Sequence, residues 1–233
     1  MAAEAEAKLN TISPTVALPA EKARAKALEF DRIADEVFAP IYLPIARRLL
    51  ELAGISRGRC VDLGCGGGHL GLALAELVTN EITLLDSNPY ALELAARRIK
   101  EADRERIATL CADVHAMPIA EASAGLVVSR GAMWFWDKEQ SLTEIRRILA
   151  PGGVAVLGGG YGSPALKTEI YRVMSERNGD DFGARQQKTT QDSLPEDYAP
   201  VAQSLGFAEV RVVHDDTGDW LLLRKAAVSG VPL

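Results

Sequence analysis

The stretch VDLGCGGGHLG, residues 61–71, places an acidic side chain two positions before a run of glycines. Gly66, Gly68 and Gly71 have the G-x-G-x-x-G spacing, and Asp86 follows the first of them by twenty residues. Such a turn is typical of dinucleotide sites, where a pyrophosphate binds the free N–H groups at the start of a helix. The glycines therefore indicate a nucleotide-like ligand. The charge of the neighbouring acid, Asp62, indicates which kind of ligand it is.

The carboxylate of Asp62 discriminates between a ligand with a diphosphate and a positively charged ligand without phosphate. It lies near the end of an apolar segment that we expect to be the first strand, so its carboxylate enters the same crevice as the glycines. A diphosphate carries about two negative charges, and placing a further anion a few ångströms away costs roughly 1 to 4 kcal/mol at effective dielectrics of about 80 to 20. A ligand with an ammonium group and a sulfonium centre but no phosphate suits both features. We therefore expect S-adenosylmethionine as the cofactor.

Further charged residues end the strand-like segments that follow. Asp86 closes EITLLD, Asp113 closes ATLCAD and Arg130 closes GLVVSR. Ligands of open α/β sheets bind beyond the carboxyl ends of the strands, near the point where the strand order reverses. We therefore expect these side chains and Asp62 to converge on one crevice, with Val114 offering apolar surface to an adenine ring.

The glycine stretch resembles motif I of the class I S-adenosylmethionine-dependent methyltransferases, with Asp62, Gly64 and Gly66 at the D-x-G-x-G positions. The resemblance extends over about residues 25–227, and LAPGGVAV is similar to the family's turn before its fifth strand. In type the chain is similar to methyltransferases of types 11 and 25 and to the small-molecule methyltransferases of ubiquinone biosynthesis. The resemblance implies transfer of a methyl group from S-adenosylmethionine to a small-molecule acceptor.

The resemblance also implies roles for individual residues. Asp86 is expected to accept hydrogen bonds from both ribose hydroxyls, Asp113 to lie near the adenine amino group, and the Val114 N–H to face a ring nitrogen. Tyr42 and Trp134 are expected to contact the acceptor, with packing in the core as the alternative for each. No cysteine and histidine pairing has the spacing of a metal site. The full set implied for cofactor binding is Asp62, Gly64, Cys65, Gly66, Asp86, Ser87, Asp113, Val114 and Arg130.

Methyl transfer does not require a dedicated base. The methyl carbon is already activated by its sulfonium, and holding the acceptor in line can lower such a barrier by ~7–11 kcal/mol. His115 and His214 are the nearest candidates by position, although a structural role is favoured for each, and the catalytic residue is left unassigned. Trp134 stands where many relatives of the ubiquinone type carry a histidine, so no base is carried over from them. Arg130 is expected either to bind an anionic acceptor or to brace an acidic residue of a loop. His69 is expected to line the methionine end of the cofactor.

Strand-like and helix-like segments alternate after residue 58, which favours a doubly wound α/β sheet. RCVDLG and GLVVSR are continuous apolar runs, as expected for parallel strands buried on both faces. FAEVRVVHDD and DWLLLRKA are joined by a short turn, so they must be antiparallel neighbours. We expect a Rossmann-like sheet of seven strands, mostly parallel, with an antiparallel strand in the C-terminal edge hairpin. The resemblance implies the order 3-2-1-4-5-7-6, and helices interrupted by Pro40 and Pro44 precede the sheet.

The chain is expected to form one domain. Its 233 residues are 48% hydrophobic, which is enough for a substantial core. Residues 1–20 lack sustained periodicity and are expected to form a mobile leader, with a single methyltransferase domain over 21–228. The segment from about 175 to 192 is polar and is expected to be a loop or mobile flap.

Charge and composition disfavour several classes of function. The net charge of −6 and the sequence pI near 5.2 oppose attachment to nucleic acid or to an anionic membrane. An acidic N-terminus and the lack of a long apolar run are expected of a cytoplasmic protein. The three cysteines suit no disulfide framework, and Cys60 and Cys111 are expected to be buried thiols.

Two other functions stay open at this point, and the oligomeric state is not predicted. One is a non-catalytic S-adenosylmethionine-binding or regulatory protein that keeps the same fold. The other is an NAD-dependent oxidoreductase, which is less favoured because Asp62 opposes a diphosphate.

Overall fold

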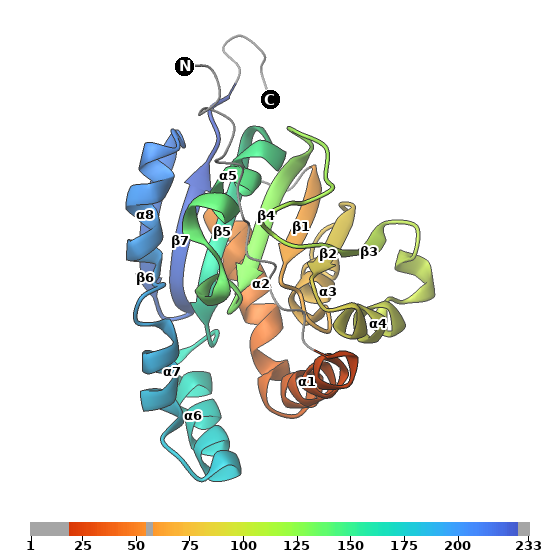
Figure 1. The fold of residues 1–233 in the computed structure, drawn as a ribbon, viewed down its shortest axis with the longest axis vertical. Coiled ribbons are helices and arrows are strands. Elements are labelled where there is room, and N and C mark those ends of the chain that lie inside the picture. Colours follow the sequence, from red (N-terminus) through yellow and green to blue (C-terminus); the bar gives the residue numbers. More distant parts are fainter. Residues whose placement is uncertain (1–18, 55–57, 228–233) are drawn as a thin grey trace, which may run out of the picture.

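The computed structural model describes residues 19–54 and 58–227 (Figure 1). All but the last two residues of the expected leader, and residue 228 of the expected domain, lie outside the described residues. Seven strands form one sheet in the order β3-β2-β1-β4-β5-β7-β6. They are β1 Arg59–Leu63, β2 Ile82–Asp86, β3 Ile107–Cys111, β4 Ala124–Arg130, β5 Leu149–Gly160, β6 Glu209–Asp215 and β7 Gly218–Arg224.

The strand directions confirm the predicted fold class. β1 pairs in parallel with β2 and β4, β2 pairs in parallel with β3, and β4 pairs in parallel with β5. β7 is antiparallel to both of its neighbours, β5 and β6. Asp216 and Thr217 alone connect β6 to β7, and a connection this short can only join antiparallel strands. The Rossmann-like sheet is therefore as predicted from the sequence, and the strand order is the one that the resemblance implies.

Helices cover both faces of the sheet because successive side chains of a strand point to opposite faces. On β5, Val156 belongs to one buried cluster and Leu157 to the other. Fully burying one such side chain contributes about 1.5–3 kcal/mol, so the central strands are held from both sides. The first cluster is completed by α2 Ala39–Ala53, α3 His69–Ala75, α4 Pro89–Arg98 and α6 Pro164–Asn178, and the second by α5 Lys138–Ile148 and α8 Pro195–Ser204.

Two N-terminal helices precede the sheet as predicted, but a single proline lies at their junction. α1 spans Ala20–Ile33, a π-helical turn η1 spans Ala34–Phe38, and α2 follows directly. Pro40 lies in the first turn of α2, a position that tolerates proline because its fixed φ suits the start of a helix. Pro44 lies inside α2, so the expected interruption at Pro44 is wrong. Packing of the apolar side of α2 in the first cluster outweighs the bond that Pro44 forfeits.

The polar segment expected to be a loop is largely helical. α6 continues to Asn178 and ends at Gly179, whose φ of 66° is in the left-handed region. α7 spans Phe182–Thr190, and the Asp181 side chain accepts the Ala184 N–H at 3.0 Å as its N-cap. The expected loop is therefore wrong, because one buried side chain, Phe182, anchors an otherwise polar helix. Movement of α7 on ligand binding stays a prediction.

The cysteines differ in burial. Cys60 on β1 is buried as predicted, whereas Cys111 at the end of β3 is exposed. The expectation for Cys111 is wrong because β3 is an edge strand, with a neighbouring strand on one side only. Among residues 19–54 and 58–227, none of the helices has both the length and the apolar character that a membrane span requires.

Candidate functional site

The turn after β1 requires glycine at several positions. Gly64, Gly66 and Gly68 have φ angles of 66°, 54° and 82°, all in the left-handed region. A Cβ added to Gly64 would lie 2.4 Å from the Cβ of Ala132, which follows β4. A Cβ added to Gly66 would meet nothing within 4 Å. The turn therefore packs tightly against the end of β4 and leaves open space beside Gly66, where a ligand can approach the backbone.

Asp62 lies near the end of β1 and is 1% exposed. Its Oδ2 accepts the backbone N–H of Gly71 in α3 at 2.9 Å. Burial raises the pKa of the Asp62 carboxyl to about 7; the Gly71 hydrogen bond lowers it and the charge of Asp86 raises it further. This carboxyl is therefore only partly ionised near neutral pH, and a positive charge placed beside it would favour its ionised form.

Asp86 ties the end of β2 to the glycine turn. Its Oδ2 accepts the Gly66 N–H at 2.9 Å, and its Oδ1 accepts the Asn88 N–H at 2.8 Å. A carboxylate has about four acceptor positions, so it can still accept hydroxyl groups. Cys65 is buried in the same turn and donates its backbone N–H to the Leu85 carbonyl at 3.0 Å. The exposed Ser87 follows directly, so the turn and the end of β2 form one continuous surface.

Asp113 follows β3, the next strand along the sheet, and its side chain is about half exposed. Its Oδ1 accepts the backbone N–H of His115 at 2.9 Å and lies 2.6 Å from Nδ1 of the same ring. The other ring nitrogen, Nε2, accepts the Asp137 N–H at 3.0 Å. The ring therefore carries its proton on Nδ1, and both nitrogens are engaged. The favoured structural role of His115 is the one that this geometry supports, and the neighbouring Val114 is buried.

His214 lies away from the glycine turn. It is on β6, the edge strand, with Nδ1 2.7 Å from Asp219 and Nε2 2.8 Å from Glu196. The two carboxylates raise the pKa of His214, the hydrogen bond to Asp219 most of all. The geometry thus places His214 in a surface ion-pair cluster, and no catalytic base is assigned.

The two expected acceptor contacts come from α2 and from the short helix that follows β4. The Tyr42 ring of α2 stacks on His69, the first residue of α3, with centroids 5.0 Å apart and an interplanar angle of 22°. Trp134 lies in η3 Met133–Phe135, and a Cβ on Gly159 of β5 would lie 2.7 Å from its Cζ2. Trp134 therefore covers the end of β5, and Tyr42 reaches the glycine turn through His69.

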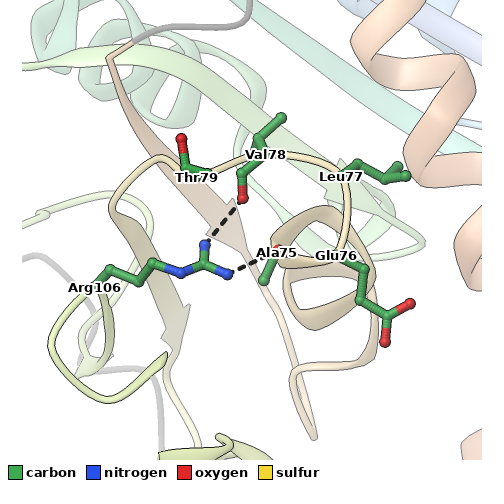
Figure 2. A pocket seen from close by; sticks show the side chains of 6 residues that line it. All are labelled: Ala75, Glu76, Leu77, Val78, Thr79 and Arg106. Carbon is green, nitrogen blue, oxygen red and sulfur yellow. Dashed lines mark hydrogen bonds between the residues drawn. The ribbon is translucent and has the colours of Figure 1, made fainter. Parts of the chain in front are cut away.

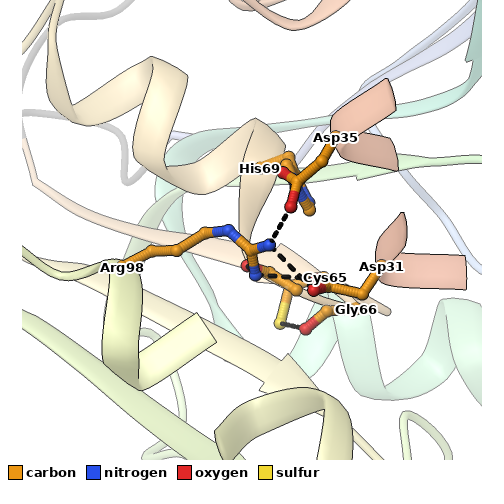
Figure 3. A network of polar contacts seen from close by, with 7 residues as sticks. Asp31, Asp35, Cys65, Gly66, His69 and Arg98 are labelled. Atoms are coloured by element: carbon orange, nitrogen blue, oxygen red, sulfur yellow. Dashed lines mark hydrogen bonds and ion pairs between the residues drawn. The ribbon is translucent and has the colours of Figure 1, made fainter. Parts of the chain in front are cut away.

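A cluster that sequence reasoning missed fastens the N-terminal helices to the glycine turn (Figure 3). We call Asp31, Asp35, His69 and Arg98 the N-terminal clasp. Arg98 of α4 binds both carboxylate oxygens of Asp31, at 2.7 and 2.8 Å, and Asp35 at 2.6 Å. The other oxygen of Asp35 lies 2.8 Å from His69 Nε2.

The clasp brings α1 and η1 into direct contact with the turn. A Cβ added to Gly67 would lie 2.1 Å from Oδ1 of Asp31. Asp31 and Asp35 are one helical turn apart, and that spacing was the only signal available in the sequence. Their partners lie 34 to 67 residues away, so only the fold brings them together.

A separate hollow lies near the amino ends of β2 and β3 (Figure 2). It is lined by residues 75–79 and by Arg106, which precede β2 and β3. Arg106 donates to the backbone carbonyls of Ala75 at 2.8 Å and Val78 at 3.1 Å, so it caps the carboxyl end of α3. This hollow lies at the amino ends of the strands and is not part of the crevice. Within the described residues, no cluster of three or more acidic, histidine or cysteine side chains is arranged to hold a metal ion.

Several proteins similar to this chain are named as methyltransferases. A family model described as a methyltransferase domain matches residues 60–153. A solved structure from Methanococcus maripaludis, assigned as an S-adenosyl-L-methionine-dependent methyltransferase, has a TM-score of 0.81 and 32% identity, covering 89% of this chain and 95% of that one. The chain therefore belongs to the S-adenosylmethionine-dependent methyltransferase family.

Curated relatives match over a shorter span. Malonyl-[acyl-carrier protein] O-methyltransferase of Methylovorus sp. (strain MP688) is 34% identical over 145 residues, which are 58% of this chain and 49% of that protein. The ubiquinone/menaquinone biosynthesis C-methyltransferase UbiE of Blochmanniella pennsylvanica is 31% identical over 121 residues, which are 49% of this chain and 47% of that protein. The chain spans about half the length of these relatives. One is named for an oxygen acceptor and the other for a carbon acceptor, so similarity alone leaves the methylated atom open.

Proposed function

We propose that this chain transfers a methyl group from S-adenosylmethionine to a small-molecule acceptor. The observation that carries the proposal is the placement of Asp62, Asp86 and Asp113 at the carboxyl ends of three neighbouring strands. Asp62 pairs with Leu84 in the register of β1 and β2, and Asp86 pairs with Cys111 in that of β2 and β3. The three acids therefore lie together at the carboxyl ends of these strands. They are beside a glycine turn whose backbone a ligand can approach.

The residues present fit the cofactor at each of its parts. Asp62 is buried and forms no ion pair with a described residue, so it would bind the ammonium group. Asp86, with acceptor positions to spare, would take the ribose hydroxyls. Asp113 and Val114 would hold the adenine, and the backbone of Gly64, Cys65, Gly66 and Ser87 would lie against the cofactor. When bound, the cofactor supplies a methyl group already activated by its sulfonium.

The chain's own contribution is position and exclusion of water. Tyr42, Trp134 and the clasped N-terminal helices border the end of the sheet where an acceptor would meet the methyl group. Holding the acceptor in line is worth ~7–11 kcal/mol, so the engaged nitrogens of His115 are no obstacle to turnover. The net charge of −6 supports a small molecule over nucleic acid. The free cysteines of the described residues are consistent with the reducing cytoplasm, where we place the protein.

Two measurements test the proposal. Isothermal titration of the full chain should show binding of S-adenosylhomocysteine and no binding of NADH at the same concentrations. Tight NADH binding without S-adenosylhomocysteine binding would instead favour the oxidoreductase. Incubation with methyl-labelled S-adenosylmethionine and fractionated small-molecule extract should then label an acceptor. Cofactor binding with no labelled product in any fraction would favour the non-catalytic alternative.

A further inference from the structure

The two oxygens of the Asp113 carboxylate have different surroundings. Oδ1 accepts two hydrogen bonds from His115, one from the backbone N–H at 2.9 Å and one from the ring nitrogen Nδ1 at 2.6 Å. Oδ2 accepts no hydrogen bond from the residues that the structure describes. The Asp113 side chain is 54% exposed, so a donor from outside the chain can reach this second oxygen. His115 therefore occupies one oxygen and leaves the other to a ligand.

The ring of His115 is itself fixed through its other nitrogen. Nε2 accepts the backbone N–H of Asp137, 22 residues further along the chain, at 3.0 Å. Asp137 is the N-cap of α5, and its Oδ1 accepts the Gln140 N–H at 2.8 Å. Because Nδ1 donates and Nε2 accepts, the ring has one orientation that satisfies both contacts. The start of α5 thus sets the direction of the Asp113 carboxylate through His115.

The loop that carries Asp113 is also held on α5 by a second set of contacts. Glu144 accepts the Met117 N–H at 2.8 Å, and Arg147 donates to the Met117 carbonyl at 2.7 Å. Arg147 and Glu144 form an ion pair at 2.7 Å, so the two side chains act on the loop together. These bonds anchor the backbone of the loop without His115. What the His115 ring adds is the direction of one carboxylate.

The direction of this carboxylate matters because hydrogen bonds are directional. A bond weakens steeply when the angle at its hydrogen falls below about 120°, so a freely rotating aspartate makes a good contact only part of the time. Holding the side chain before the ligand arrives also reduces the entropy that is lost on binding. Asp113 has this advantage because its Oδ1 is already bonded, and the proposed function puts the adenine amino group beside it.

We propose that His115 is a positioning residue for base recognition, which holds Oδ2 of Asp113 ready for the amino group of adenine. The site then selects a purine that carries this amino group over one that lacks it. The inference rests on the proposed function, because it requires the adenine of S-adenosylmethionine beside Asp113. It gives His115 a part in ligand selectivity and none in proton transfer.

S-adenosylhomocysteine without its adenine amino group is the probe that tests the proposal, because it keeps the ring nitrogen expected to face Val114. The wild-type chain should bind S-adenosylhomocysteine about 10- to 100-fold more tightly than this deamino analogue, as a charge-assisted hydrogen bond predicts. His115→Leu removes both ring nitrogens and should lower the preference by about 3- to 10-fold. His214→Leu, in the surface ion-pair cluster, is the matched control and should keep the full preference.

Two conservative variants separate the contacts of the two ring nitrogens. His115→Asn keeps an amide N–H close to the position of Nδ1, so it can donate to Asp113 but does not reach Asp137. His115→Gln keeps an amide oxygen close to the position of Nε2, so it can accept from Asp137 but no longer donates to Asp113. His115→Asn should therefore retain most of the preference, whereas His115→Gln should lose as much of it as His115→Leu.

The outcomes separate the two proposals. A wild-type chain that does not bind S-adenosylhomocysteine overturns the proposed function and this inference with it. A wild-type chain that binds S-adenosylhomocysteine and the deamino analogue equally overturns the inference alone. So does a His115→Leu variant that keeps the wild-type preference, or a His115→Gln variant that keeps more of it than His115→Asn. The preference is a ratio measured within one variant, so a general loss of stability does not imitate the expected result.

Discussion

The carboxylate of Asp62 and the backbone N–H of Gly71 are joined by a hydrogen bond of 2.9 Å, which links the end of β1 to the helix that follows it. A single neutral donor offsets only part of the cost of burying a carboxylate, so burial still raises the pKa of Asp62 to about 7. The group that we expect to bind the cofactor's ammonium therefore exchanges a proton close to neutral pH. Both ligand binding and folding should report this exchange.

Cofactor affinity should rise with pH through 7. The ammonium group binds the ionised form of Asp62, so below its pKa the binding must also remove a proton. Affinity for S-adenosylhomocysteine should be about tenfold weaker at pH 6 than at pH 8, measured by isothermal titration. Asp62→Asn keeps an acceptor for Gly71 and removes the proton exchange, so its weaker affinity should change little over this range. An unaltered pH profile in Asp62→Asn would assign the effect to another group in the turn.

Folding stability should depend on pH in the opposite direction. The pKa of Asp62 is about 7 in the folded chain and has its ordinary value of 3.8 when the side chain is exposed to water, so the folded state binds more protons between these limits. The contribution of Asp62 to the free energy of unfolding therefore falls as pH rises from about 4 to 7. The free energy of unfolding of the ligand-free chain, measured by chemical denaturation, should fall with pH over this window. This fall should be less steep in Asp62→Asn than in the wild type. Identical slopes would contradict the assignment.

Removing the Asp86 carboxylate should weaken cofactor binding by ~1–3 kcal/mol, because two ribose contacts are lost. Asp86 also accepts the N–H groups of Gly66 and Asn88, so Asp86→Ala should unfold at a modestly lower temperature while keeping its circular dichroism spectrum. Glu93→Ala, at an exposed acid of α4, is the matched control and should leave affinity unchanged. Wild-type affinity in Asp86→Ala would refute the role assigned to Asp86.

The N-terminal clasp should control how fast the cofactor leaves. Arg98→Gln removes the partner of Asp31 and Asp35 and should lower the free energy of unfolding by about 1–3 kcal/mol. Because α1 and η1 would no longer be held on the glycine turn, stopped-flow measurements should show faster dissociation of S-adenosylhomocysteine. The neighbouring Arg97→Gln, at an exposed position of the same helix, should change neither quantity. Equal dissociation rates in the two variants would show that the clasp only stabilises the fold.

The sequence predicted those features that depend on short-range patterns. The parallel strands were visible as apolar runs, and the hairpin as two runs with a short connection. Asp62, Asp86 and Asp113 could be placed together because the ends of parallel strands meet at one edge, whatever the side chains do there. The same argument placed Arg130 at the crevice.

The features that the sequence did not predict depend on tertiary contacts. Nothing near Pro44 in the chain indicates that burial of α2 keeps the helix continuous across it. The helix at Phe182–Thr190 is polar enough to be taken for a loop, since one buried ring anchors it. Asp31 and Arg98 are ordinary helix-surface residues until the fold places them against the glycine turn.

Gly64 and Gly54 form a matched pair for the steric requirement of the glycine turn. Their φ angles are 66° and 62°, so an alanine at either position carries a similar strain of about 1–2 kcal/mol. A Cβ at Gly64 would lie 2.4 Å from the Ala132 Cβ, whereas a Cβ at Gly54 would meet nothing within 4 Å. Gly64→Ala should therefore lose about 1–3 kcal/mol more unfolding free energy than Gly54→Ala. It should also weaken S-adenosylhomocysteine binding, because relieving the clash moves the end of β4 away from the turn. Equal losses in the two variants would show that the turn and β4 separate without cost, and that this contact does not shape the cofactor site.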